Sequence, residues 1–164
     1  MQTFSNMRRN SAHQNNLALL GLSGWLLFDL IMSSLYPLIP SFAGVVFCYL
    51  ILNFNHHEEN AAPLMLAFLY LCLYDLTKGF YLFSYVILFV IVYKFAIYRI
   101  QNIITCNNCI LAAYVVIAYL GHYFLNAFFA YMDNETFPYF SNIYFYYIAI
   151  DSILSFLLFK VVTR

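Results

Sequence analysis

Residues 81–93 read YLFSYVILFVIVY, an almost uninterrupted run of apolar and aromatic side chains. A strand of a membrane barrel needs alternating apolar and polar residues, because one side of it faces lipid and the other faces the lumen. This run shows no such alternation, so it predicts a helix. Residues 80–98 extend this run to the nearest polar residues. Their number is close to the about 20 residues that a helix needs to cross a bilayer.

The rest of the chain has the same character. Of 164 residues, 65% are hydrophobic, 21% are aromatic and 9% are charged, whereas a soluble domain carries about 25% charged residues. The seven basic and seven acidic residues cancel, so no positive surface is available for nucleic acid. The composition excludes a soluble enzyme, a disordered segment and a nucleic-acid binder. It predicts an all-α integral membrane protein whose first partner is the lipid bilayer.

Charges, prolines and asparagine-rich patches divide the chain into about six apolar helices. The predicted spans are Leu17–Tyr36, Pro40–Phe54, Pro63–Thr77, Phe80–Tyr98, Cys109–Met132 and Ser141–Val162. Residues 1–16 form a polar cytoplasmic tail, residues 17–162 a single transmembrane helical domain, and residues 163–164 a cytoplasmic end. The first span reads as a signal anchor, because no small-x-small cleavage pattern follows it.

Orientation follows from the excess of Lys and Arg in cytoplasmic segments. Six spans with the amino terminus inside return the carboxyl terminus to the same side. Only Lys78 then faces outward, and six of the seven basic residues lie on the cytoplasmic side: Arg8, Arg9, Lys94, Arg99, Lys160 and Arg164. This bias predicts a multi-pass protein with both termini in the cytoplasm.

Two predicted turns on the outer side contain residues that are typical of turns. Pro37 ends the first span and Pro40 starts the second, because proline stops a helix interior but suits a first helical turn. Lys78 and Gly79 form the turn after the third span, where glycine supplies the conformational freedom.

Five polar residues lie within the predicted spans or at their ends, where by default they suggest function. His122 and Asn126 are one turn apart and share a helix face, and we expect them to meet Asp29 and Asp151 in a buried cluster. The cluster is either a proton or cation site, or an interhelical hydrogen-bond network that holds the bundle together. Asp75 either caps the next turn or pairs with Lys78, three residues on.

No sequence pattern indicates catalysis. The chain has no serine–histidine–aspartate set, no glycine-rich phosphate loop and no paired-carboxylate motif, so no enzyme and no cofactor are predicted. Cys106-Asn-Asn-Cys109 has the spacing of half a zinc site, and His56-His57 lies in the other inner loop. Adjacent histidines are not the usual second half, so no metal is predicted.

The order of features resembles the MreD family of rod shape-determining proteins. These are small bacterial inner-membrane proteins with five or six spans. The matching stretches are residues 36–40 (YPLIP), residues 69–79 (LYLCLYDLTKG), the helix that runs to Arg99, and the ending FKVVTR at 159–164. Asp75-Leu76 and Gly79 are the specific matches, whereas tyrosine stands where the family usually has glycine before the Asp-Leu pair.

The resemblance implies a non-catalytic role in the cell-elongation machinery that builds peptidoglycan in rod-shaped bacteria. The implied partners are an MreC-like protein and other membrane proteins of that complex, and the implied location is the bacterial inner membrane. The fold also looks related to the substrate-binding membrane subunit of energy-coupling-factor transporters. The alternative is therefore a subunit that binds a vitamin or metal near the outer face.

Overall fold

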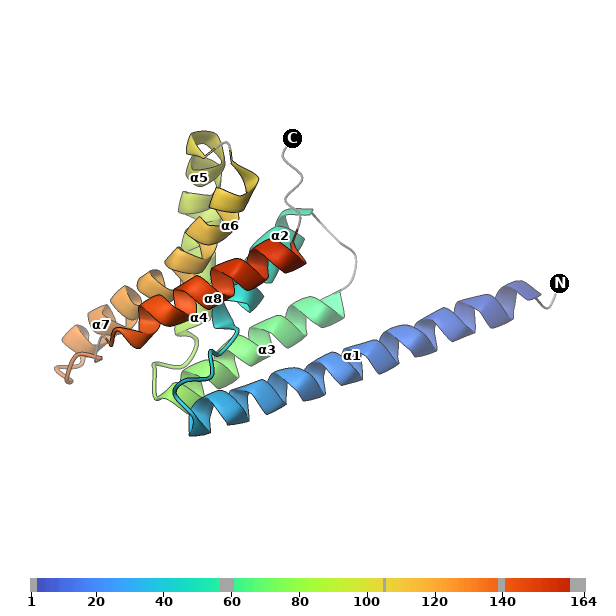
Figure 1. Cartoon of the computed structure of the whole chain (residues 1–164), viewed down its shortest axis with the longest axis horizontal. Helices are drawn as coiled ribbons and strands as arrows, with labels where there is room; N and C mark the ends of the chain where they lie inside the picture. The colour runs from blue at the N-terminus through green and yellow to red at the C-terminus, as the bar shows by residue number, and fades with distance from the viewer. Residues whose placement is uncertain (1–2, 57–60, 105, 139–140, 160–164) are drawn as a thin grey trace.

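The computed structural model describes residues 3–56, 61–104, 106–138 and 141–159, and it describes the side chains of all of these except 3–18, 55, 56 and 107. Every regular element in these ranges is helical (Figure 1). In chain order they are α1 (Thr3–Leu35), α2 (Ala43–His56), α3 (Ala61–Lys78), α4 (Ser84–Ile91), η1 (Val92–Ala96), α5 (Ile97–Ile103), α6 (Asn107–Val116), η2 (Ile117–Gly121), α7 (His122–Met132) and α8 (Ile143–Leu158). The π-helical segments η1 and η2 join their neighbours into continuous helices, so six helical rods result. The all-α prediction is confirmed for the described residues.

Three of these rods are long and apolar enough to cross a membrane: Ala61–Lys78, Ser84–Ile103 and Asn108–Met132. The other three apolar stretches, Leu19–Leu35, Ala43–Phe54 and Ile143–Leu158, are shorter than 18 residues. Non-helical residues before Ala43 and Ile143 explain why the second and sixth stretches start later than predicted.

Several boundaries differ from the predictions, four of them in ways that matter for the site or the topology. Helix α1 already begins at Thr3, within the predicted polar tail. Pro40 does not begin α2, which starts at Ala43. The fourth rod starts at Ser84 and continues past Arg99 to Ile103. The fifth rod starts at Asn107, two residues before the predicted Cys109.

The late start of α4 has a backbone cause. Gly79 and Phe83 adopt left-handed conformations, with φ of 72° and 67°. The Phe80 N–H donates back to the Asp75 carbonyl, which closes the last turn of α3 as in a Schellman-type ending. An apolar run alone does not reveal this interruption.

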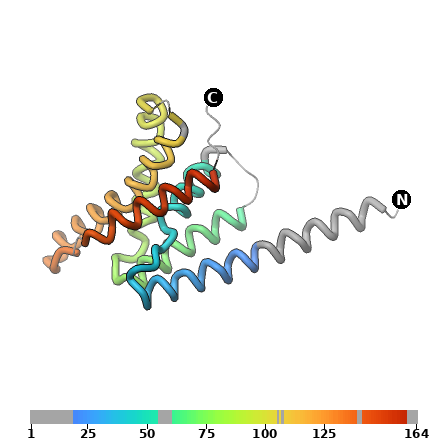
Figure 2. Tube along the Cα trace, in the orientation of Figure 1, coloured from blue at the N-terminus to red at the C-terminus, as the bar shows by residue number. Residues whose placement is uncertain are grey.

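Helix α2 is the centre of the bundle. It contacts α3, α6, η2 and α8, and all side chains from Ala43 to Cys48 are buried. Helix α1 contacts α3 and leaves most of its own apolar side chains exposed, among them Trp25, Phe28 and Ile31. The tube in Figure 2 shows the last part of α1 alongside α3. A buried central helix with an apolar outer surface is the arrangement that a lipid-facing bundle requires.

Candidate functional site

Both carboxylate oxygens of Asp75 have partners inside the bundle. Asp75 is completely buried near the end of α3, and its Oδ1 lies 2.8 Å from His122 Nε2. Its Oδ2 accepts the Tyr85 N–H at 3.3 Å, which provides a partner for an otherwise unpaired donor in the first turn of α4. Of the two sequence interpretations, Asp75 therefore caps the next turn. It does not pair with Lys78, whose Nζ donates to the Ser33 carbonyl.

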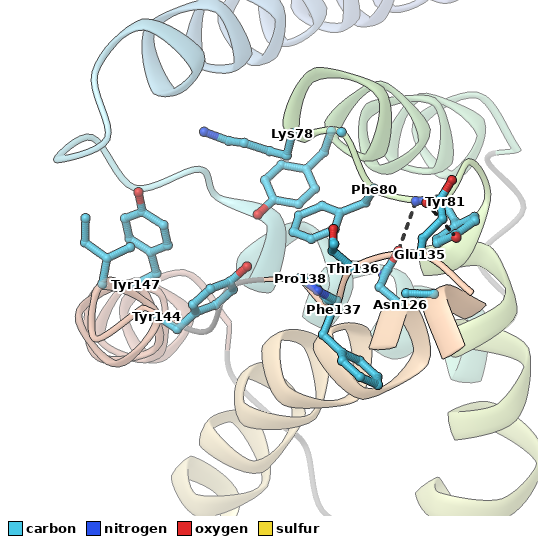
Figure 3. Close-up of a pocket in the computed structure, with 14 residues that line it drawn as sticks. Lys78, Phe80, Tyr81, Asn126, Glu135, Thr136, Phe137, Pro138, Tyr144 and Tyr147 are labelled. Carbon is cyan, nitrogen blue, oxygen red and sulfur yellow. Dashed lines mark hydrogen bonds between the residues drawn. The ribbon is translucent and has the colours of Figure 1, made fainter. Parts of the chain in front are cut away.

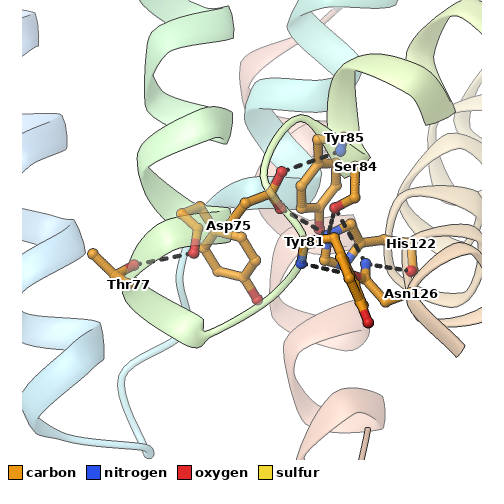
Figure 4. Close-up of polar contacts among 8 residues, drawn as sticks. Asp75, Thr77, Tyr81, Ser84, Tyr85, His122 and Asn126 are labelled. Atoms are coloured by element: carbon orange, nitrogen blue, oxygen red, sulfur yellow. Dashed lines mark hydrogen bonds and ion pairs between the residues drawn. The ribbon is translucent and has the colours of Figure 1, made fainter. Parts of the chain in front are cut away.

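His122 and Asn126 complete this network from α7 (Figure 4). Ser84 Oγ lies 2.7 Å from His122 Nε2, and Asn126 Nδ2 donates to Ser84 Oγ at 3.2 Å and to the His122 carbonyl at 2.9 Å. Asn126 Oδ1 accepts the Tyr81 N–H at 2.9 Å. These contacts join α3, the α3–α4 turn and α7. We call Asp75, Ser84, His122 and Asn126 the α3–α7 network.

Aromatic rings enclose the network. The His122 ring stacks on Tyr85 with centroids 3.9 Å apart, and it meets the edge of Phe80 at 4.7 Å. His122 and Asn126 are 2% and 1% exposed. Hydrogen bonds surrounded by apolar groups resist competition from water, so the network serves well as an interhelical connection.

Asp29 and Asp151 lie elsewhere, at the amino-terminal end of α2. Asp151 Oδ2 accepts the Gly44 N–H at 2.9 Å and the Tyr119 hydroxyl at 2.7 Å. Asp29 Oδ2 accepts the Tyr70 hydroxyl at 2.7 Å. The first N–H groups of a helix lack intrahelical partners and carry partial positive charge. A carboxylate from α8 thus satisfies the start of the buried central helix.

The predicted cluster of Asp29, Asp151, His122 and Asn126 is therefore wrong as one site. His122 and Asn126 do come together, but their acid is Asp75. The acids face different partners: Asp75 and Asp151 accept first-turn N–H groups of α4 and α2, whereas Asp29 accepts the Tyr70 hydroxyl. An apolar sequence does not specify that pairing.

The sequence interpretation missed the buried tyrosines. Tyrosines near helix ends suit a membrane interface, and Tyr36, Tyr98 and Tyr131 are exposed as that position requires. Tyr70 and Tyr119, however, are 2% and 1% exposed and donate to Asp29 of α1 and Asp151 of α8. Their position in the middle of apolar runs was the available signal, since a buried tyrosine hydroxyl needs a partner.

A cavity of about 550 Å³ adjoins the α3–α7 network at the end of the bundle (Figure 3). It lies where the α3–α4 turn, the α7–α8 loop and the start of α8 meet. We call this the three-turn cavity. Its walls include Tyr74, Lys78, Phe80, Asn126, Glu135 and Tyr144. Such a volume is in the range of small-molecule sites.

The predicted turn residues border the same end. The Pro37 carbonyl accepts the Tyr147 hydroxyl, which ties the α1–α2 turn to α8. Pro40 is half-buried in that turn. Lys78 and Gly79 both line the cavity. Three connections that are far apart in sequence thus form one surface.

The cysteines form no disulfide among the described residues. Cys106 and Cys109 are exposed, and hydrogen bonds from the Cys109 side chain and backbone lower the pKa of Cys106. No group of three His, Cys, Asp or Glu side chains suited to a metal occurs in the described part of the chain. His57, one half of the histidine pair, lies outside the described residues.

Comparison with known proteins gives no family assignment: no protein-family model, no curated protein and no solved structure matches this chain.

Proposed function

We propose that this chain is a multi-pass protein of the bacterial inner membrane, with both termini in the cytoplasm. Three helices of sufficient length and hydropathy support the membrane location. The exposed apolar side chains on α1, α4 and α8 would face lipid. In this orientation the three-turn cavity opens to the outer side, since Lys78 lines it.

We further propose that the protein is a non-catalytic component of the cell-elongation complex, as the MreD resemblance implies. The observation that carries this proposal is the fold of residues 69–79, the stretch on which the resemblance depends. Both carboxylate oxygens of Asp75 have partners inside the bundle, and Gly79 makes a left-handed turn. Both residues therefore shape the outer end of a helical scaffold, and neither presents a reactive group.

Depletion of the protein in its host tests this role. Rods should become spheres, and the wild-type gene should restore them. Among complementing variants, Asp75→Ala should fail, whereas Gly24→Ala, which alters an open position on α1, should succeed. Unchanged rod shape on depletion, with the protein demonstrably absent, contradicts the proposal.

A second candidate function is the substrate-binding membrane subunit of an energy-coupling-factor-type transporter for a vitamin or metal. The three-turn cavity favours it, because a purely structural bundle has no need of a hollow of about 550 Å³. Co-purification of a coupling ATPase with the tagged chain would support this candidate. Co-purification of MreC-like protein without an ATPase would support the first.

A further inference from the structure

The three-turn cavity carries two charged side chains that do not neutralise one another. Lys78 and Glu135 both line it, yet neither forms an ion pair within the part of the chain that the structure describes. Lys78 Nζ donates to the Ser33 carbonyl and is within electrostatic range of Asp29, which it does not contact as an ion pair in the described residues. Glu135 Oε2 accepts the Tyr81 hydroxyl at 3.1 Å. Each charge thus keeps capacity for a further partner.

The two charges stand on different walls. Lys78 comes from the end of α3, and Glu135 comes from the α7–α8 loop. Figure 3 shows them on opposite sides of Phe80, with Tyr144 below the lysine. A ligand between them meets positive charge at one end, negative charge at the other, and aromatic rings in the middle.

The surroundings of Lys78 and of Glu135 strengthen the interaction of each side chain with an oppositely charged ligand group. Lys78 is half-buried, so an anion beside its ammonium group is less screened than at an open surface. Glu135 is exposed at the mouth, and tyrosine rings nearby can also receive a cation on their faces. A ligand of single charge would leave one of the two groups without a partner.

We infer that the three-turn cavity binds a small zwitterion, with its carboxylate at Lys78, its ammonium group at Glu135, and an apolar or aromatic body against the rings of Phe80 and Tyr144. This inference deepens the second candidate function by naming a ligand class. It does not depend on the elongation role, because a scaffold protein can also hold a ligand.

Three related probes test this arrangement on the purified full-length chain in nanodiscs. 4-(Aminomethyl)benzoate carries the two charges at opposite ends of its ring, 4-methylbenzoate lacks the ammonium group, and 4-methylbenzylamine lacks the carboxylate. Equilibrium dialysis of each labelled probe measures its affinity. 4-(2-Aminoethyl)benzoate and 4-(aminomethyl)phenylacetate extend the panel to larger separations of the two charges. We expect the zwitterions to bind and each singly charged analogue to bind at least about tenfold more weakly, as loss of one charged hydrogen bond predicts.

Charge variants locate the two ends. Lys78→Gln should weaken the binding of 4-(aminomethyl)benzoate at least about tenfold and remove the preference for it over 4-methylbenzylamine. Glu135→Gln should weaken its binding and remove the preference for it over 4-methylbenzoate. Lys94→Gln, a change at an exposed lysine of η1 outside the cavity, should change neither. Glu135 is exposed, so its variant reports on binding even if Lys78→Gln lowers stability.

Two results overturn the inference. One is failure of all three aromatic zwitterions to bind at millimolar concentration to folded protein. The other is binding that the singly charged analogues match and that Glu135→Gln leaves unchanged. The dialysis uses no partner protein, so its failure leaves the depletion and co-purification tests untouched.

Discussion

Replacement of Gly44 by alanine should destabilise the bundle more than any other glycine-to-alanine change in the described residues. A Cβ at this position would lie 2.7 Å from Asp151 Oδ2, 2.9 Å from Tyr119 Cε2 and 3.1 Å from Val115 Cγ1. Real Cβ atoms do not approach so closely, and the obstructing groups are themselves buried and bonded. The carboxylate must therefore withdraw from the start of α2.

The magnitude follows from two contributions. Excess volume in a well-filled core costs about 1–3 kcal/mol. Withdrawal of Asp151 Oδ2 also weakens its bonds to the Gly44 N–H and the Tyr119 hydroxyl, and a buried group left unsatisfied costs about 1–3 kcal/mol. The free energy of unfolding should fall by about 2–6 kcal/mol, which for a chain of this size lowers Tm by at least about 4 °C.

Thermal melting of the purified protein in detergent, followed by size-exclusion chromatography, measures the effect. Gly24→Ala is the matched control, because it is also a helix position and its Cβ would meet nothing within 4 Å. There alanine improves helix propensity by about 1 kcal/mol, so Tm should stay or rise. A double-mutant cycle with Asp151→Ala should show that much of the penalty depends on the carboxylate.

A Gly44→Ala protein that melts within about 1 °C of Gly24→Ala would refute this reasoning, given that the two changes should differ by several degrees. If Gly44→Ala lowers the free energy of unfolding equally with and without the Asp151 carboxylate, the loss of stability does not come from displacement of that carboxylate. Either result would show that the close approach of α8 to α2 does not hold in the protein.

Three further predictions concern the other turns and loops. Asp75→Ala should lower the free energy of unfolding by about 3 kcal/mol, because His122 loses its acid partner and a first-turn N–H of α4 is left unpaired; Asp75→Asn should cost less in the same melting assay. Gly79→Ala should cost about 1–2 kcal/mol from its φ of 72° alone, since a Cβ there meets no atom within 4 Å; an unchanged Tm would argue against this turn. Because the pKa of Cys106 is lowered, its thiolate persists to lower pH than that of an ordinary thiol. Alkylation of Cys106 by iodoacetamide, measured by mass spectrometry, should therefore reach half its maximal rate at a pH below the usual thiol pKa. A midpoint at or above the usual thiol pKa would contradict the prediction.

The helices themselves were predictable because their signal is local. Apolar runs bounded by prolines, charges and asparagines identified six helical segments, and the part of the chain that the structure describes contains six continuous rods. The ends were less predictable, since backbone geometry fixes them. Phe83 in a left-handed conformation has no composition signal, and it delays α4 relative to the apolar run.

The candidate site was predictable only in part. The i, i+4 spacing placed His122 and Asn126 on one face, and Asn126 Nδ2 does bond the His122 carbonyl. The cavity beside them was not foreseen, because its walls come from a turn and a loop separated by two complete helical rods. Lys78 was predicted as a turn residue, whereas its position beside Glu135 is a property of the folded chain.

By itself, the sequence determined that this chain is helical, strongly apolar and poor in charged residues, since each of these depends on composition or on neighbours within a few turns. Only the tertiary structure decided which partner each buried acid bonds to. Asp75 meets His122 across 47 positions, and Asp151 meets Gly44 across 107. Such pairings depend on the rotation and depth of each helix in the bundle, which the summed contacts of all the helices set together.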